Sequence, residues 1–185
     1  MKLYAILLGC KPHGRNIEQH DIFFTICEDI NYALPAIKNF WPEGGDNLHI
    51  DSWREVTAIE GCKIQVVNRD SQLQGEQELA LFFINLGGYK KDDFEEHHYK
   101  MIIVAESKTE AIAFAKHSVF YRHTGFKGAE SHIDDKYGID VDDIYRIEDI
   151  LPVIEKTNFR IVITREENLV SDKLHIGYLK LSKLE

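Results

Sequence analysis

The chain has 185 residues, of which 44% are hydrophobic and 29% charged, a balance typical of a globular protein with its own core. The formal net charge of -9 disfavours nucleic acids and anionic membranes as partners, because both attract clusters of Lys and Arg. No apolar segment approaches the length needed to cross a bilayer, and three cysteines without a Cys-x-x-Cys pattern indicate neither a disulfide framework nor a cysteine-based metal site.

The apolar stretch from Lys2 to Leu8 predicts a buried strand and not a targeting segment. No small-x-small cleavage site follows it, and a similar stretch recurs internally at Leu79 to Leu86. We therefore expect a cytoplasmic protein. Each of the three cysteines is expected to be a small buried apolar residue, and Cys10, beside Gly9 in a polar loop, is the only candidate for a reactive thiol.

The following segments predict a strand, a helix and a hairpin. Ile22 to Cys27 is rich in β-branched and aromatic residues and predicts the second strand. A helix begins near Asn31, tolerates Pro35 in its first turn and stops at Trp41-Pro42-Glu43-Gly44-Gly45. The alternation from Trp53 to Thr57 and from Cys62 to Val67, around Glu60-Gly61, predicts a hairpin.

Much of this pattern returns later in the chain. Strands are predicted at Leu79 to Leu86 and Tyr99 to Ala105, and Ser107-Lys108-Thr109-Glu110 is a capping box that starts a helix. Asp140 to Leu151 fits a helix or a strand, and we favour a strand because the first half has one there. Short motifs recur as well: Leu8-Gly9 as Leu86-Gly87, Glu18-Gln19-His20 as Glu95-Glu96-His97, and His49-Ile50-Asp51 as His132-Ile133-Asp134.

These recurrences predict an internal repeat. The predicted domains are repeat 1 at residues 1–70, repeat 2 at 79–152 and an extension at 153–185, in which Phe159 to Thr164 and Leu174 to Leu181 form a C-terminal β-hairpin. The predicted fold class is α+β, with mostly antiparallel sheets and two tandem strand-strand-helix-strand(-strand) repeats. We expect the repeats to pack with pseudo-twofold symmetry into one compact globular body.

Histidines and carboxylates at matching positions form the candidate site. On an extended strand, residues two apart point to the same face, so each His has a carboxylate beside it. Imidazole and carboxylate groups bind divalent metals and act as acid and base, although no HExxH pattern is present. The alternative is a structural role, in which these side chains bond the loops of each repeat, and the repetition itself favours it. The candidates are Glu18, His20, His49, Asp51, Glu95, His97, His132 and Asp134.

The joint pattern resembles a bacterial family known as domain of unknown function 1543, which has one or two copies per chain. The resemblance covers residues 1 to about 152 and implies two copies here, but it implies no activity, ligand or catalytic residue. It rests on Leu8-Gly9-x-Lys11-Pro12, Glu18-Gln19-His20-Asp21, Phe40-Trp41-Pro42, His49-Ile50-Asp51, Leu86-Gly87-Gly88-Tyr89-Lys90 and His132-Ile133-Asp134-Asp135-Lys136-Tyr137-Gly138.

With no catalytic motif in the sequence, a binding role is favoured over catalysis. We expect a module that binds a small molecule or a protein at the junction of the two repeats. The alternative is a metal-dependent enzyme that uses the His, Asp and Glu residues. No motif identifies a cofactor, a divalent metal is one open alternative, and a homodimer is another.

Overall fold

A computed structural model of the chain describes residues 1–71, 78–89, 92, 94–117, 125–126, 129–130 and 141–184. The fold is of the α+β class, with antiparallel sheets and short helices, as the sequence predicted. The chain divides into two compact units, the first made of Met1–Gln74 with Leu151–Glu185 and the second of Gly75–Ile150. In the described part of the chain, no helix has the length and apolar character needed to span a bilayer.

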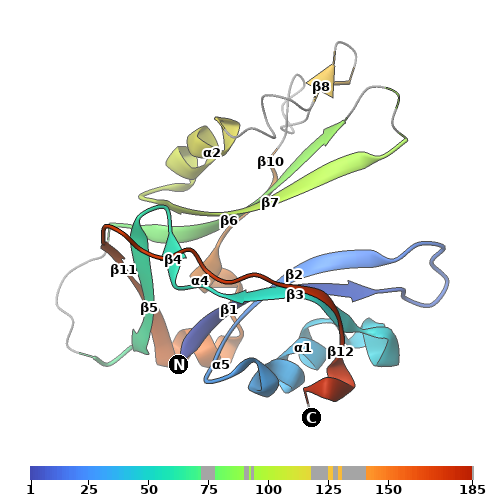
Figure 1. Ribbon diagram of the computed structural model, residues 1–185, viewed down its shortest axis with the longest axis horizontal. Coiled ribbons are helices and arrows are strands. Elements are labelled where there is room, and N and C mark those ends of the chain that lie inside the picture. The colour runs from blue at the N-terminus through green and yellow to red at the C-terminus, as the bar shows by residue number, and fades with distance from the viewer. Residues whose placement is uncertain are drawn as a thin grey trace. The chain divides into compact units, whose positions relative to one another are not determined.

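The first unit is built on a four-stranded antiparallel sheet with the strand order β12-β3-β1-β2. Figure 1 shows the helices η1 and α1 against one face of this sheet. Tyr4, Ile6, Leu8 and Phe23 from the sheet pack there on Ile37 of α1. The elements are β1 (Lys2–Cys10), β2 (Gln19–Cys27), η1 (Ile30–Ala33), α1 (Leu34–Phe40), η2 (Pro42–Asn47), β3 (His49–Glu55), β12 (His175–Lys180) and η3 (Leu181–Lys183).

A second sheet of this unit has the order β11-β5-β4, formed by β4 (Ala58–Ile59), β5 (Cys62–Asn68) and β11 (Phe159–Arg165). The predicted turn at Glu60-Gly61 is present, and both residues have the positive φ, 50° and 75°, that suits a tight hairpin. The strand that returns along β5, however, is the short β4 and not the alternating stretch that begins at Trp53. That stretch lies mainly in β3, in the other sheet.

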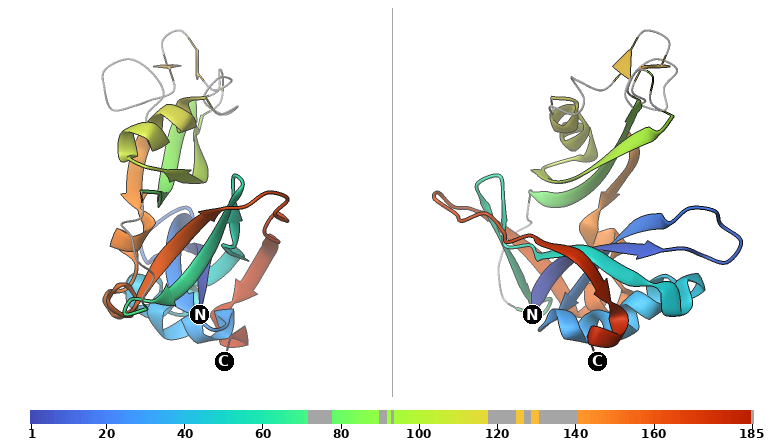
Figure 2. Two further views of the ribbon diagram at one scale, coloured as in Figure 1. Left: turned by 90° about the vertical axis from the view of Figure 1, so that its left-hand side faces the viewer. Right: turned by 45° about the vertical axis from the view of Figure 1, so that its right-hand side comes forward.

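The prediction of a C-terminal β-hairpin is wrong. β11 pairs with β5 and β12 pairs with β3, so the two strands that were expected to pair with each other lie in different sheets (Figure 2). Alternating apolar residues predict that a segment is extended, but they do not specify which strand it joins. The helix α5 (Val153–Asn158) precedes β11, and its Glu155 accepts hydrogen bonds from the Thr25 hydroxyl and the Ile26 amide of the edge strand β2, both at 2.6 Å.

The second unit has a three-stranded antiparallel sheet with the order β10-β6-β7. The predicted capping box starts α2, where the Ser107 hydroxyl accepts from the Glu110 amide, while the Glu110 carboxylate accepts from the amide of Glu106. Ala111 and Ala115 of α2 pack on the sheet. The elements are β6 (Ala80–Tyr89), β7 (Glu96–Ala105), α2 (Lys108–Lys116), β8 (Gly125–Phe126), β9 (Ala129–Glu130), β10 (Val141–Arg146) and α4 (Ile147–Ile150). The ambiguous Asp140 to Leu151 segment thus contains both a strand and a helix.

The first hairpins of the two units have the same register. Adding 78 to each residue number of the β1–β2 ladder gives the β6–β7 ladder: the pair Lys2 and Cys27 becomes Ala80 and Ala105, and Gly9 and His20 becomes Gly87 and His98. This register places His98, and not His97, at the position of His20. A change of one residue matters, because it transfers a side chain to the opposite face of the sheet.

The third strands also correspond, with an offset of 91. Glu55 opposite Tyr4 becomes Arg146 opposite Phe82, and Ile50 opposite Leu8 becomes Val141 opposite Leu86. Each ladder is interrupted once, and the residue skipped is Asp51 in β3 and Asp142 in β10. The register counterpart of Ile50 is therefore Val141, whereas the motif His132-Ile133-Asp134 lies outside the described residues. The tandem repeat of residues 1–70 and 79–152 remains a prediction, which these registers support, and the pseudo-twofold packing of the repeats remains a prediction as well.

Candidate functional site

Three neighbouring strands place two histidines beside a glycine. In the order β2-β1-β3, His20 lies opposite Gly9 in one ladder and His49 lies opposite the same Gly9 in the other. The three residues form one row across the sheet, near the end of β1. A row of this kind brings together side chains that are far apart in the sequence.

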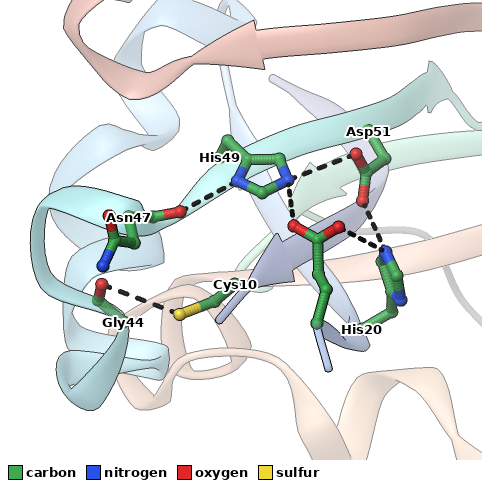
Figure 3. Close-up of polar contacts among 7 residues, drawn as sticks. Cys10, His20, Gly44, Asn47, His49 and Asp51 are labelled. Atoms are coloured by element: carbon green, nitrogen blue, oxygen red, sulfur yellow. Dashed lines mark hydrogen bonds and ion pairs between the residues drawn. The ribbon is translucent and has the colours of Figure 1, made fainter. Parts of the chain in front are cut away.

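A β-bulge adds Asp51 to this row. The β1–β3 ladder runs from Leu7 opposite Ser52 to Leu8 opposite Ile50, so Asp51 is the extra residue on β3. Bulges bend a strand and re-aim its side chains, and they are frequent beside functional sites. The Asp51 carboxylate consequently contacts both imidazoles (Figure 3).

Glu18, His20, His49 and Asp51 form a closed ring of contacts, which we call the four-residue cluster. The His49 Nε2 atom lies 3.0 Å from Oε1 of Glu18 and 3.4 Å from Oδ1 of Asp51. The His20 Nε2 atom lies 3.2 Å from Oδ2 of Asp51 and 3.9 Å from Oε2 of Glu18. The structure thus brings together all four candidates that the sequence identified in its first repeat.

The orientation of His49 is fixed from its other nitrogen. Its Nδ1 lies 2.8 Å from the backbone carbonyl oxygen of Asn47 (Figure 3). Because a carbonyl oxygen only accepts, Nδ1 must carry a proton and donate it. The Nε2 atom then either carries a second proton, which it donates to the carboxylates, or presents a lone pair toward them. In the second state, the Nε2 lone pair and the carboxylates repel each other, so a proton held by a carboxyl group, or another cation, is needed between them.

Gly9 leaves the space that the cluster occupies. A Cβ atom on Gly9 would lie 2.5 Å from Oδ2 of Asp51 and 2.5 Å from Nε2 of His49. Both distances are shorter than any ordinary carbon contact, so a side chain at this position would displace the cluster. The side chain of His49 is only 7% exposed, which leaves it little room to move.

One oxygen of the cluster lacks a hydrogen bond. Oδ2 of Asp51 is buried and accepts none from the described residues, although it lies at ion-pair distance from His20. Buried acceptors are almost always paired in native proteins, because the lost solvation is otherwise not recovered. The two carboxylates also leave the cluster negatively charged when both imidazoles are neutral. The arrangement is therefore suited to a donor that carries positive charge.

The sequence analysis did not identify Tyr178, which borders the cluster. The Tyr178 ring lies 4.4 Å from the ring of His49, centre to centre, and is 62% exposed. Three residues earlier on β12, His175 stacks on Trp53 at 3.8 Å with the two rings 3° from parallel. No motif in the sequence pointed to Tyr178, because its proximity depends on the pairing of β12 with β3.

All three cysteines are buried, as expected, and the structure does not support Cys10 as a candidate for a reactive thiol. Cys10 is buried, and its Sγ donates a weak hydrogen bond to the carbonyl oxygen of Gly44 at 3.7 Å. Burial raises the pKa of the thiol, and the nearby Glu18 carboxylate raises it further. A thiol in such surroundings is a poor nucleophile at neutral pH because little of it is thiolate.

The candidates of the second repeat are only partly described. Glu95 is exposed before β7, and His97 lies opposite Gly88 in the β6–β7 ladder. His132 and Asp134 lie outside the described residues. Among the residues that are described, no group of three or more His, Cys, Asp or Glu side chains is arranged to hold a metal ion.

Residues 15–66 match the model of the family called Domain of Unknown Function (DUF1543). This segment of the chain is similar to the DUF1543 family. It contains every member of the four-residue cluster, together with β2, α1 and β3. The resemblance stated from the sequence is thereby confirmed for the first repeat, whereas a second tandem copy stays a prediction.

Among solved structures, the chain is similar to the crystal structure of a protein Il1583 from Idiomarina loihiensis, with a TM-score of 0.63 and 20% sequence identity. The match covers 97% of this chain and 97% of that chain. At this identity the likeness shows a shared fold and nothing about activity. No protein with curated annotation is significantly similar to the chain.

Proposed function

We propose that the first unit is a small-molecule binding module and that the four-residue cluster recognises a cationic nitrogen, such as an amine or a guanidinium. The buried Oδ2 of Asp51, which accepts no hydrogen bond from the described residues, carries this proposal. A ligand N–H that bonded this oxygen would recover the free energy lost when the oxygen was buried. Glu18 and His20 have side chains 44% and 43% exposed, so a ligand can reach the cluster from solvent.

Tyr178 supports the same ligand class. An exposed aromatic ring beside carboxylates attracts a cation through its negative face, in addition to the ion pairs that the carboxylates form. Hydrogen bonds to charged groups are worth about 1.5–3 kcal/mol each, so two of them would give a small ligand measurable affinity. The four-residue cluster is thus sufficient for recognition without a large apolar cavity.

One contact favours the alternative of a metal-dependent enzyme. A histidine that ligates a metal usually donates its other ring nitrogen to a carbonyl or carboxylate, as Nδ1 of His49 does to Asn47. The described residues are not arranged as a metal site, however, and we therefore rank this alternative second.

A thermal-shift and calorimetry panel tests both proposals. The panel contains butylamine, butylguanidine, the uncharged butanol, Zn²⁺ and Mn²⁺. We expect the two nitrogen cations to bind and Asp51→Asn and Glu18→Gln to weaken them about tenfold each, since one charged hydrogen bond is lost in either variant. Glu28→Gln, which removes an exposed carboxylate of the same unit, is the control.

Equal binding of butanol, or unchanged binding in Asp51→Asn, would contradict the proposal. A shift produced by the metals alone, and lost in His49→Ala, would instead support the metal-dependent alternative.

As for location and partners, we propose the cytoplasm and no association with nucleic acid, on the basis of the composition and the net charge of -9. A protein partner or a homodimer remains a prediction, for which the solution mass is the measurement.

A further inference from the structure

A groove of about 460 Å³ lies in the first unit, at the opposite end of β1 from the four-residue cluster. Four segments line it: the start of β1, the connection between β3 and β4, the strand β5, and residues Leu169 and Val170 between β11 and β12. At the rise of about 3.3 Å per strand residue, Leu3 in the groove is about 20 Å from Gly9. The groove is therefore separate from the cluster.

The groove has an apolar floor and an apolar wall. Leu3, Val56 and Ile64 are buried beneath it, and Val170 on its wall is 85% exposed. The volume lies within the range of roughly 300–1,000 Å³ that is common for small-molecule sites.

The charged side chains that line the groove are Lys2, Lys63 and Glu55. Lys2 pairs with Glu55 at 2.9 Å, and Lys63 pairs with Glu166 at 3.4 Å. The lining thus has an excess of positive charge in a chain whose formal net charge is -9. Exposed pairs of this kind are weak, so a ligand anion can replace a protein carboxylate at little cost.

Asp172 holds the wall of the groove in place. Its side chain is fully buried, and one carboxylate oxygen accepts from the Thr57 amide at 3.0 Å, the Thr57 hydroxyl at 2.6 Å and the Ala58 amide at 3.1 Å. These bonds join the β3–β4 connection to the segment that carries Leu169 and Val170. The groove is consequently formed before any ligand arrives, which lowers the entropic cost of binding.

From this combination we infer that the groove is a second binding site, for a small anion with an apolar body, such as a medium-chain carboxylate. The carboxylate lies between Lys2 and Lys63, and the chain packs against Val170 and Val66. This inference does not depend on the proposed function of the cluster, because the two sites share no residue.

The test uses octanoate as the probe and octanamide as its uncharged counterpart, titrated into the full-length chain with methyl-labelled Ile, Leu and Val. We expect octanoate to shift the Ile64, Val66 and Val170 signals, and Lys63→Gln to weaken its binding about fivefold, since a partly exposed ion pair is lost. Lys180→Gln, which removes an exposed cation of β12, and Asp51→Asn at the cluster should both leave the affinity unchanged.

Higher ionic strength should also weaken octanoate binding, because the pairing with Lys63 is screened. Val170→Asp provides a second variant, which keeps the fold but places a negative charge on the wall, and it should abolish the shifts. Equal affinities of octanoate and octanamide, shifts that map outside the groove, or no shifts at millimolar octanoate would each overturn the inference.

Discussion

Replacement of Gly9 by alanine tests whether the four-residue cluster is packed as tightly as the structure indicates. The added Cβ atom would approach Oδ2 of Asp51 and Nε2 of His49 to 2.5 Å, so both side chains would have to move. His49 cannot move freely, because it is buried and its Nδ1 is bonded to Asn47. Forcing an extra carbon into such a site costs roughly 1–3 kcal/mol.

An opposing contribution comes from the unfolded chain. Gly9 does not have a positive φ, so alanine is compatible with its backbone conformation. Replacing Gly by Ala at a compatible position stabilises a protein by about 0.4–1 kcal/mol, because the unfolded chain loses conformational freedom. The net effect expected for Gly9→Ala is thus a loss of about 1.3 kcal/mol in the free energy of unfolding, within a range of roughly 0–2.6 kcal/mol, as the difference between these two contributions.

Urea unfolding followed by tryptophan fluorescence measures this loss. The chain has two tryptophans, Trp41 and Trp53, and both lie in the first unit, so the signal reports the unit that contains Gly9. The decisive comparison repeats the substitution in a His49→Ala/Asp51→Ala background. With the clashing groups removed, Gly9→Ala should become neutral or stabilising, and the cycle isolates the contact energy. An equal loss in both backgrounds would refute the packing argument.

Four further outcomes are expected. Glu155→Ala should lower the free energy of unfolding by about 2–4 kcal/mol in urea, because it orphans the Thr25 hydroxyl and a backbone amide, whereas Glu155→Gln should cost much less. Burial raises the pKa of the Glu155 carboxyl, so the wild type should lose stability relative to Glu155→Gln as pH rises through that folded-state pKa, and a pH series of urea midpoints checks the sign. Burial also raises the pKa of Cys10 above its ordinary value and that of Cys27 to about 12. The native protein should therefore react with a thiol-specific disulfide reagent at pH 8 at least about tenfold more slowly than the protein unfolded in urea. Rapid labelling of the native protein would contradict this. Asp172→Ala should reduce stability by about 1–3 kcal/mol by thermal or urea unfolding and should also weaken octanoate binding, because it releases the wall of the groove.

The elements of the fold could be predicted from the sequence where local chemistry decides them. The apolar run at Lys2 to Leu8 forms β1, and the Ser107 cap and its Glu110 start α2 as expected. Strand partners could not be predicted, because pairing is set by contacts between distant segments. β12 looked like the second half of a hairpin, yet it pairs with β3, and for this reason Tyr178 was missed.

The candidate site was predictable in the first repeat for a specific reason. Glu18 with His20, and His49 with Asp51, are spaced two apart on extended chain, and β2 and β3 flank the same strand. The residues of the second repeat were matched to those of the first less securely, because two segments with the same amino-acid motif do not necessarily have the same strand register. The ladders align His20 with His98 and Ile50 with Val141, whereas the shared Glu-x-His and His-Ile-Asp motifs align His20 with His97 and Ile50 with Ile133.

The registers also alter the argument about what His49 does. A histidine repeated in both units would favour a structural role, since duplicated units need the same internal bonds. The residue 91 positions after His49 in the sequence is Asp140, which lies outside the described residues, just before the third strand of the second unit. The described β10–β6 ladder, from Val141 to Arg146, has the matching bulge and contains no histidine. We propose that the imidazole of His49 and the buried Oδ2 atom of Asp51, which accepts no hydrogen bond from the described residues, serve a ligand.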